Sequence, residues 1–258
     1  MNLKIGDYVT RNSYSNDTVF IVLKIVDDIV YLKGIDVRLY ADSKIDDLVI
    51  VDTVIYEDSF GTEVLNEMEM DRSDFFYLPA KILHIDGDKD YLERCLDFYK
   101  KANVYAVGKN ISEDKIATEI NSLLNQYNPD IVIITGHDAY YKKSGSISDL
   151  RNYKNTKNFI NAVKKARMYE KSHDKLVIIA GACQSNYEEL IKAGANFASS
   201  PKRINIHALD PAIIASTLAL TERNKEVDLI TLLEKTKYGK NGMGGLVSNG
   251  LMFVGYPR

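Results

Sequence analysis

The sequence has few cysteines, no long apolar run and no surplus of positive charge. Its two cysteines, Cys95 and Cys183, form no CxxC pair, which argues against a disulfide scaffold and a zinc site and favours a reducing compartment. No run reaches the eighteen or so apolar residues of a membrane span. The first residues lack the basic start and apolar core of a signal peptide. With 33 Lys and Arg against 36 Asp and Glu, nucleic acid is not expected as the main partner.

The chain of 258 residues suits one large or two small domains. Residues 1–52 contain five short apolar runs without helical periodicity, which predicts a small SH3-like β-barrel. Such barrels usually bind partners rather than catalyse, so we expect a docking or regulatory role. Residues 53–74 are acidic and predict an exposed linker or loose helix, whose one basic residue is Arg72.

Residues 75–258 alternate between apolar runs and amphipathic segments. Strands are predicted near 80–86, 104–107, 130–135 and 175–180, separated by helices over about 88–102, 112–124 and 157–169. This alternation predicts an α/β fold, a parallel doubly wound sheet with helices on both faces. Further on, we expect helices over about 210–221 and 226–238, a flexible glycine-rich loop at 242–245, and a terminal β-hairpin around Asn249-Gly250.

Two of the predicted strands end in the same way. Lys175-Leu-Val-Ile-Ile-Ala-Gly-Ala-Cys-Gln-Ser185 is an apolar β-branched run that ends in small residues and presents Cys183 before a helix that starts near Asn186. Asp130-Ile-Val-Ile-Ile-Thr-Gly-His-Asp138 repeats the pattern and presents His137. Because the carboxyl ends of parallel strands lie at one edge of a sheet, we expect His137 and Cys183 to be neighbours.

A thiol beside an imidazole suggests nucleophilic catalysis. Cys183 would attack a carbonyl, His137 would take the thiol proton and return it to the leaving group, and the backbone N–H groups of Cys183 and Asp138 would stabilise the oxyanion. The two residues lie 46 positions apart, close to the roughly 50 of caspases. The Asp138 side chain is not expected to orient His137, because adjacent side chains on an extended segment point in opposite directions.

Several alternatives remain open at this stage. His207 is a second candidate base, whereas His84 lies in an apolar strand and His173 at a helix end. The Gly-Ala-Cys-Gln-Ser turn also serves amidotransferase-like and thioesterase hydrolases. Finally, the chain could be a scaffold whose barrel binds partners while the α/β domain is inert.

The sequence resembles the YabG family of sporulation-specific cysteine peptidases of spore-forming Firmicutes over nearly its whole length. The shared motifs include Lys81-Ile-Leu-His-Ile-Asp-Gly-Asp88, Ile134-Thr-Gly-His-Asp-Ala-Tyr140, Ala180-Gly-Ala-Cys-Gln-Ser185, Ala193-Gly-Ala-Asn-Phe-Ala-Ser-Ser-Pro201 and Asn205-Ile-His-Ala-Leu-Asp-Pro211. The segment 54–76 looks shorter than in the relatives. A looser similarity, in the spacing of His and Cys, links it to the caspase and clostripain clan and implies a caspase-like sheet.

The resemblance implies an endopeptidase, without a cofactor, that cuts precursors of the spore coat and cortex after arginine. It would act in the cytoplasm of the sporulating mother cell and could enter the coat. An arginine pocket needs a carboxylate facing the guanidinium, and Asp86, Asp88 and Asp210 are the candidates, although Asp88 also fits a helix N-cap. Arg72 would then be a site of self-cleavage.

Overall fold

The structure is a computed structural model, and it describes residues 3–51, 59–68, 76–141 and 146–255. The chain divides into two compact units, Met1–Asp58 and Ser59–Arg258. Arg72 lies outside the described residues, as does most of the predicted linker.

The first unit is an antiparallel sheet in the order β4-β3-β2-β1-β5. Its core consists of alternate apolar side chains, among them Val9, Phe20 and Leu32. Five short strands were expected, and the described part of this unit contains five. The bounds are β1 Tyr8–Arg11, β2 Phe20–Val26, β3 Ile29–Gly34, β4 Tyr40–Lys44 and β5 Leu48–Ile50, with 3-10 turns at Asn12–Tyr14 and Ile45–Asp47. The SH3-like closure of this sheet stays a prediction.

The second unit contains a six-stranded sheet in the order β13-β11-β10-β9-β7-β8. Its strands are β7 Ile82–Asp86, β8 Ala106–Asn110, β9 Ile131–Thr135, β10 Val177–Ala180, β11 Phe197–Ser199 and β13 Met243–Gly245. The first five run parallel, and β13 is antiparallel to β11. The predicted parallel sheet is therefore confirmed, while its caspase-like character stays a prediction.

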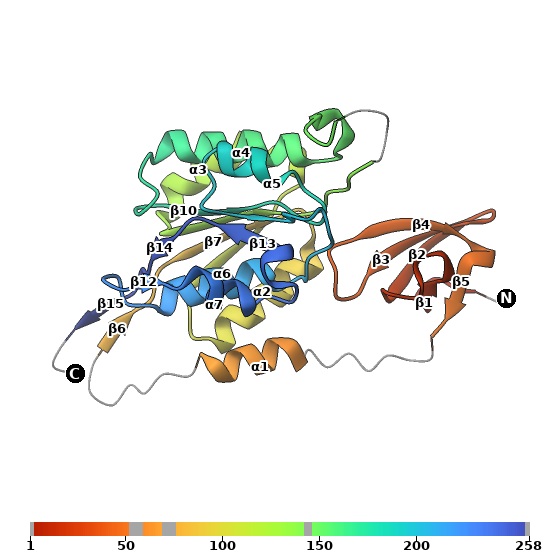
Figure 1. Cartoon of the computed structure of the whole chain (residues 1–258), viewed down its shortest axis with the longest axis horizontal. Helices are drawn as coiled ribbons and strands as arrows, with labels where there is room; N and C mark the ends of the chain where they lie inside the picture. The colour runs from red at the N-terminus through yellow and green to blue at the C-terminus, as the bar shows by residue number, and fades with distance from the viewer. Residues whose placement is uncertain (1–2, 52–58, 69–75, 142–145, 256–258) are drawn as a thin grey trace. The chain divides into compact units, whose positions relative to one another are not determined.

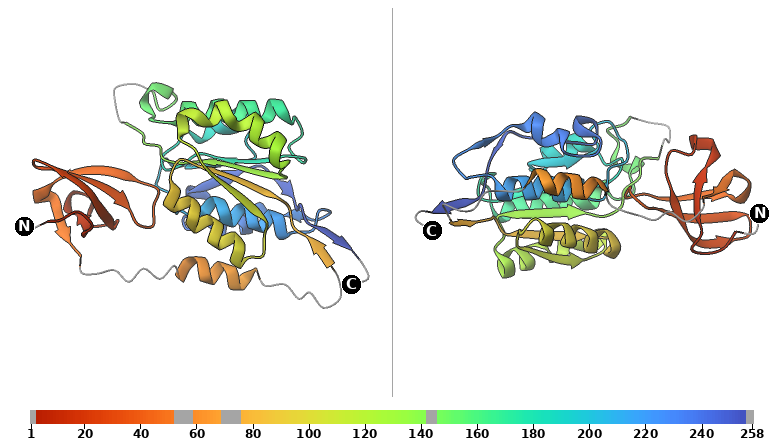
Figure 2. Two further views of the ribbon diagram at one scale, coloured as in Figure 1. Left: turned by 180° about the vertical axis from the view of Figure 1, so that it is seen from behind. Right: turned by 90° about the horizontal axis from the view of Figure 1, so that it is seen from below.

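Helices cover both faces of this sheet (Figures 1 and 2). On one face lie α3 Glu113–Tyr127, α4 Thr156–Tyr169 and α5 Tyr187–Lys192; on the other lie α1 Ser59–Glu67, α2 Lys89–Lys101, α6 Asp210–Leu220 and α7 Leu229–Glu234. The strands are apolar throughout because both faces are buried. Leu83 and Ile85 face the α3 and α4 side, while Ile82 faces α2 and α6.

The strand order places β7, the first strand of this sheet, between β8 and β9. The chain thus builds outward in opposite directions from β7, and the crevice at such a reversal is where open α/β sheets bind ligands. The loops that follow β7 and β9 border this crevice. They carry Asp88 and His137.

Three predictions for the C-terminal part are wrong. The glycine-rich segment is not a flexible loop but contains β13, and a side chain at Gly245 would overlap the Phe197 ring. The terminal hairpin is absent: β14 Ser248–Asn249 pairs with β12 Glu226–Val227, and β15 Phe253–Gly255 pairs with β6 Phe76–Leu78. The helix predicted from residue 226 begins only at Leu229, because the Asp228 side chain accepts hydrogen bonds from the N–H groups of Ile230 and Thr231 and so caps the helix there.

Among the helices of the described ranges, none has both the length and the apolar character that a bilayer crossing requires.

Candidate active site

Cys183 lies beyond the end of β10, in a turn that its neighbours determine closely. Gly181 has φ of +101°, and a side chain there would overlap Ser199, so only glycine fits this position. The Cys183 side chain is fully buried. The backbone N–H of Ile206 donates to its sulfur at 3.3 Å, and the Ile206 carbonyl lies 3.8 Å away. An N–H donor favours the thiolate form of a cysteine.

Gln184 follows the cysteine in the left-handed region, with φ of +59°. Its side chain accepts a hydrogen bond from Tyr140 N at 3.1 Å and donates to Asn205 Oδ1 at 3.1 Å. These two bonds tie the cysteine turn to the segment after His137 and to the segment that carries Ile206. Backbone strain of this kind is common at functional sites.

His137 follows β9, which is the neighbour of β10 in the sheet. The strands are in parallel register, with Ile134 beside Ala180, and Thr135 Oγ1 donates to the Gly181 carbonyl at 2.8 Å. The prediction that the histidine and cysteine runs end side by side as parallel strands is therefore confirmed. The His137 ring is almost completely buried and lies 5.6 Å from the Tyr91 ring, centroid to centroid.

Two carboxylates hold His137. Its Nε2 lies 2.9 Å from Asp88 Oδ2, and its backbone N–H donates to Glu113 Oε1 at 2.7 Å. The Glu113 carboxylate also fills the space over Gly87 and Gly136, where a Cβ would overlap it. Glu113 therefore holds the loops after β7 and β9 together. Its position in the first turn of a helix resembles that of any exposed acidic residue, so no sequence pattern indicates this contact.

Asp138 connects three segments through its buried side chain. Its carboxylate accepts hydrogen bonds from the N–H groups of Ala139 and Asn155 and from the hydroxyls of Thr156 and Ser185. Burial raises the pKa of Asp138 above its ordinary value of 3.8, although these four donors act in the opposite direction. The side chain thus links the histidine loop, the start of α4 and the cysteine turn. It does not hydrogen-bond to the His137 ring.

The three carboxylates predicted for arginine binding are all buried and hydrogen-bonded. Asp86 Oδ1 accepts from Asp88 N at 2.9 Å, and Asp88 Oδ1 accepts from the N–H groups that open α2. Asp210 accepts from His207 N and Lys237 N, both at 2.9 Å. Asp86 and Asp88 lie on the loop that borders His137, whereas Asp210 begins α6.

The other histidines and the second cysteine lie in different surroundings. His207 Nδ1 accepts a hydrogen bond from Leu209 N at 3.2 Å, and its ring contacts Phe60 edge-on. His84 is fully buried in β7, where its Nδ1 lies 2.8 Å from Tyr99 Oη. Cys95 is also fully buried, on α2, and its Sγ donates to the Ala208 carbonyl at 3.4 Å.

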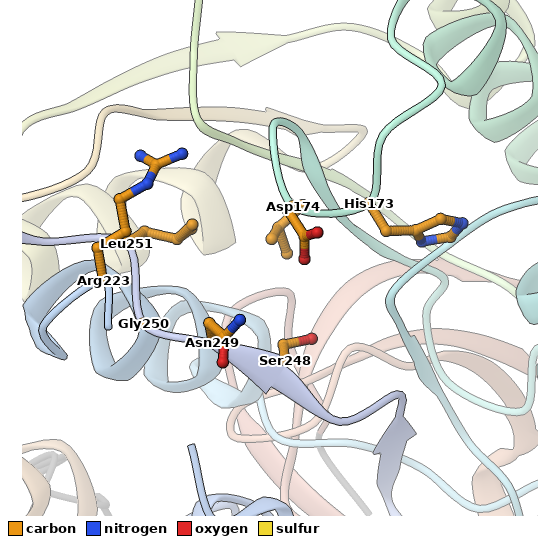
Figure 3. Close-up of a pocket in the computed structure, with 8 residues that line it drawn as sticks. His173, Asp174, Arg223, Ser248, Asn249, Gly250 and Leu251 are labelled. Carbon is orange, nitrogen blue, oxygen red and sulfur yellow. The ribbon is translucent and has the colours of Figure 1, made fainter. Parts of the chain in front are cut away.

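A separate pocket lies at the opposite, amino end of β10. It has a volume of about 160 Å³ and is lined by residues that include His173, Asp174, Val177 and Asn249. Figure 3 shows that the Asp174 carboxylate and the Asn249 side chain face one another across it. Because Val177 begins the strand whose other end leads to Cys183, this pocket is not part of the site described above.

The fold and the paired strand ends define an α/β protein with a histidine and a cysteine on neighbouring loops of one sheet edge. Comparison with known proteins narrows this class. The model of the YabG peptidase family U57 matches residues 4–257. The sporulation-specific protease YabG of Bacillus subtilis (strain 168) is 40% identical over 286 aligned residues, which cover 100% of this chain and 99% of that protein. The chain belongs to the YabG peptidase family, and it is a peptidase.

Proposed function

We propose that this protein is a cysteine endopeptidase of sporulation, with Cys183 as nucleophile and His137 as general base. The observation that carries the proposal is the parallel register of β9 and β10, which brings the His137 and Cys183 loops to one edge of the sheet. The N–H group of Ile206 at the sulfur supports a reactive thiol, because it stabilises negative charge there.

In the proposed reaction, His137 takes the proton of the Cys183 thiol as the sulfur attacks the carbonyl carbon of the scissile peptide bond. The backbone N–H groups of Cys183 and Asp138 would stabilise the negative oxygen. Protonated His137 then gives its proton to the leaving amine, which leaves a thioester on Cys183. Water activated by His137 hydrolyses the thioester and restores the enzyme.

The substrates we propose are precursor proteins of the spore coat and cortex, cut after arginine in the cytoplasm of the sporulating mother cell. The name of the Bacillus subtilis relative supports the link to sporulation. A guanidinium requires a carboxylate in its pocket, and Asp86, Asp88 and Asp210 remain the candidates. The antiparallel sheet of the first unit would dock a protein partner, and the enzyme could later enter the coat.

The test is cleavage of a peptide library by the wild type, Cys183→Ala and Cys95→Ala. Both cysteines are fully buried, so Cys95→Ala is a matched control for the loss of a buried thiol. We expect Cys183→Ala to lose at least about 10³-fold in kcat/KM and Cys95→Ala to retain cleavage after arginine. Wild-type cleavage by a folded Cys183→Ala protein would refute the proposed nucleophile.

A further inference from the structure

We propose that Asp88 is a positioning residue, which holds the His137 ring in the one tautomer and orientation that can accept the thiol proton. This inference rests on the proposed function, because it concerns the same histidine. The geometry that points to it is the 2.9 Å contact between Asp88 Oδ2 and His137 Nε2. The side chains are 4% and 9% exposed, respectively, so water competes little for this bond.

The two oxygens of Asp88 have different partners. Oδ1 accepts hydrogen bonds from Asp90 N at 3.0 Å and Tyr91 N at 3.1 Å, and so caps α2, while Oδ2 faces His137. The N-cap bonds fix the side-chain rotamer of Asp88. The helix therefore aims the second oxygen at the imidazole.

The backbone of Asp88 is also fixed by a hydrogen bond to the end of β7. Its N–H donates to Asp86 Oδ1 at 2.9 Å, and Asp86 Oδ2 lies 3.6 Å from His84 Nε2. His84 in turn contacts the Tyr99 hydroxyl of α2. These buried groups of β7 and α2 anchor the turn that carries Asp88, so the carboxylate cannot easily follow a moving histidine.

The chemical consequence follows from what a carboxylate can do. An ionised carboxylate only accepts hydrogen bonds, so His137 must carry its proton on Nε2, and the lone pair is on Nδ1. When the S–H bond of Cys183 breaks, the proton forms a bond to Nδ1. The imidazolium that results is stabilised by the negative charge of Asp88, which itself stays unprotonated.

The experiment uses the full-length chain and three variants, Asp88→Asn, Asp88→Ser and Asp90→Asn. Asn and Ser both cap helices well, so neither variant should unfold α2, and melting temperatures will check this. Asp90→Asn is the matched control, because Asp90 lies in the same turn but is exposed. Peptides with arginine or lysine before the scissile bond provide kcat, KM and the preference between the two.

We expect Asp88→Asn to lower kcat by about 10³- to 10⁴-fold, because its amide donates to Nε2 and forces the proton onto Nδ1. Asp88→Ser, which is too short to reach the ring, should lose less. KM and the arginine-to-lysine preference should change less than threefold, and Asp90→Asn should match the wild type.

The tautomer itself can be observed by long-range ¹H–¹⁵N NMR of protein labelled at histidine, in a Cys183→Ala background with or without Asp88→Asn. The His137 signals are assigned with His137→Gln. A change from the Nε2–H to the Nδ1–H form is the expected result.

The inference is overturned by an unchanged kcat in Asp88→Asn, by an unchanged tautomer, or by a loss confined to arginine peptides, which would place Asp88 in the substrate pocket. Loss of activity in Cys183→Ala with wild-type activity in Asp88→Asn would reject this inference alone.

Discussion

Asp138 shows how one side chain can hold several loops of a site in place. Four donors from three segments converge on its carboxylate, and two of them are partly buried backbone N–H groups. An unsatisfied buried donor costs about 1–3 kcal/mol. The stability of the cysteine turn therefore depends on a residue that follows the histidine directly in the sequence.

Replacing Asp138 tests this arrangement. Asp138→Ala should lower the free energy of unfolding by about 2–4 kcal/mol, because it leaves two buried hydroxyls and two partly buried N–H groups without their acceptor. Asp138→Asn should cost much less, since its oxygen can face the two N–H groups while the Thr156 and Ser185 hydroxyls rotate to accept from its amide. Urea unfolding followed by circular dichroism measures both. Equal losses in the two variants would contradict the proposed role of these hydrogen bonds.

The raised pKa of Asp138 predicts a pH dependence of stability. Since the pKa in the folded protein exceeds the ordinary value of 3.8, the folded state binds more protons in the window between the two values. The contribution of Asp138 to the free energy of unfolding is therefore greatest below pH 3.8 and falls as pH rises through the folded pKa. The difference in stability between the wild type and Asp138→Asn should fall over this window when unfolding is measured at a series of pH values. A difference that rises or stays constant there would contradict the direction of the shift.

At the level of elements, Glu113 explains why glycine ends two strands. A methyl group at Gly87 would overlap the Glu113 carboxylate, and moving that carboxylate would break its bond to His137 N. We predict that Gly87→Ala and Glu113→Ala each destabilise the protein by about 1–3 kcal/mol. The double variant should be no less stable than Glu113→Ala alone, because removal of the Glu113 carboxylate leaves room for the methyl group at position 87.

The measurement is a double-mutant cycle by urea unfolding. Gly108→Ala serves as the control, because a methyl group there would meet Leu96 instead of Glu113. Its effect should add to that of Glu113→Ala. Additive effects of Gly87→Ala and Glu113→Ala would show that the two residues are not coupled.

The sequence predicted the elements well where the signal is local. Buried parallel strands are uniformly apolar, so the runs that end before His137 and Cys183 could be recognised, and the rule for parallel strands brought their ends together. The C-terminal strands were misassigned because their partners lie far away in sequence. Strands as short as β15 and β6 show no sequence periodicity from which their pairing could be predicted.

The contacts within the site show the same limit. His137 and Cys183 stand out as chemically active types at strand ends, but Glu113 and Gln184 resemble ordinary surface residues. Their roles depend on distances between loops, which a sequence pattern does not encode. Asp88 was recognised as an N-cap candidate, yet its second oxygen could be assigned only once the position of His137 was known.

At the scale of the whole molecule, the first helix of the second unit bears on the predicted self-cleavage. Val64 of α1 is buried in the core that α2 and α6 share, and Phe60 contacts the His207 ring. Lys237 Nζ lies 5.1 Å from the centre of the Phe60 ring. A cut after Arg72 would break the chain between α1 and the rest of its unit. The packing contacts of α1 would still hold it to that unit.

We therefore predict that self-cleavage after Arg72 yields two fragments that elute together in size-exclusion chromatography. Mass spectrometry should find residues 1–72 and 73–258 in the wild type, and only intact chain in Cys183→Ala and Arg72→Gln. Phe60→Ala should loosen the association, because it removes the contact with His207. An intact wild-type chain that cuts peptides would contradict the cleavage, and fragments that elute separately would contradict the role of α1.

The complete burial of the Cys183 sulfur limits the rate at which electrophilic reagents can modify it. An electrophile in solution can touch this atom only while the surrounding chain is open, and such opening has its own rate. Inactivation will consequently level off as the reagent concentration rises, at a ceiling that the protein sets. A polypeptide that displaces the chain around Cys183 would then be both the substrate and the trigger of the reaction.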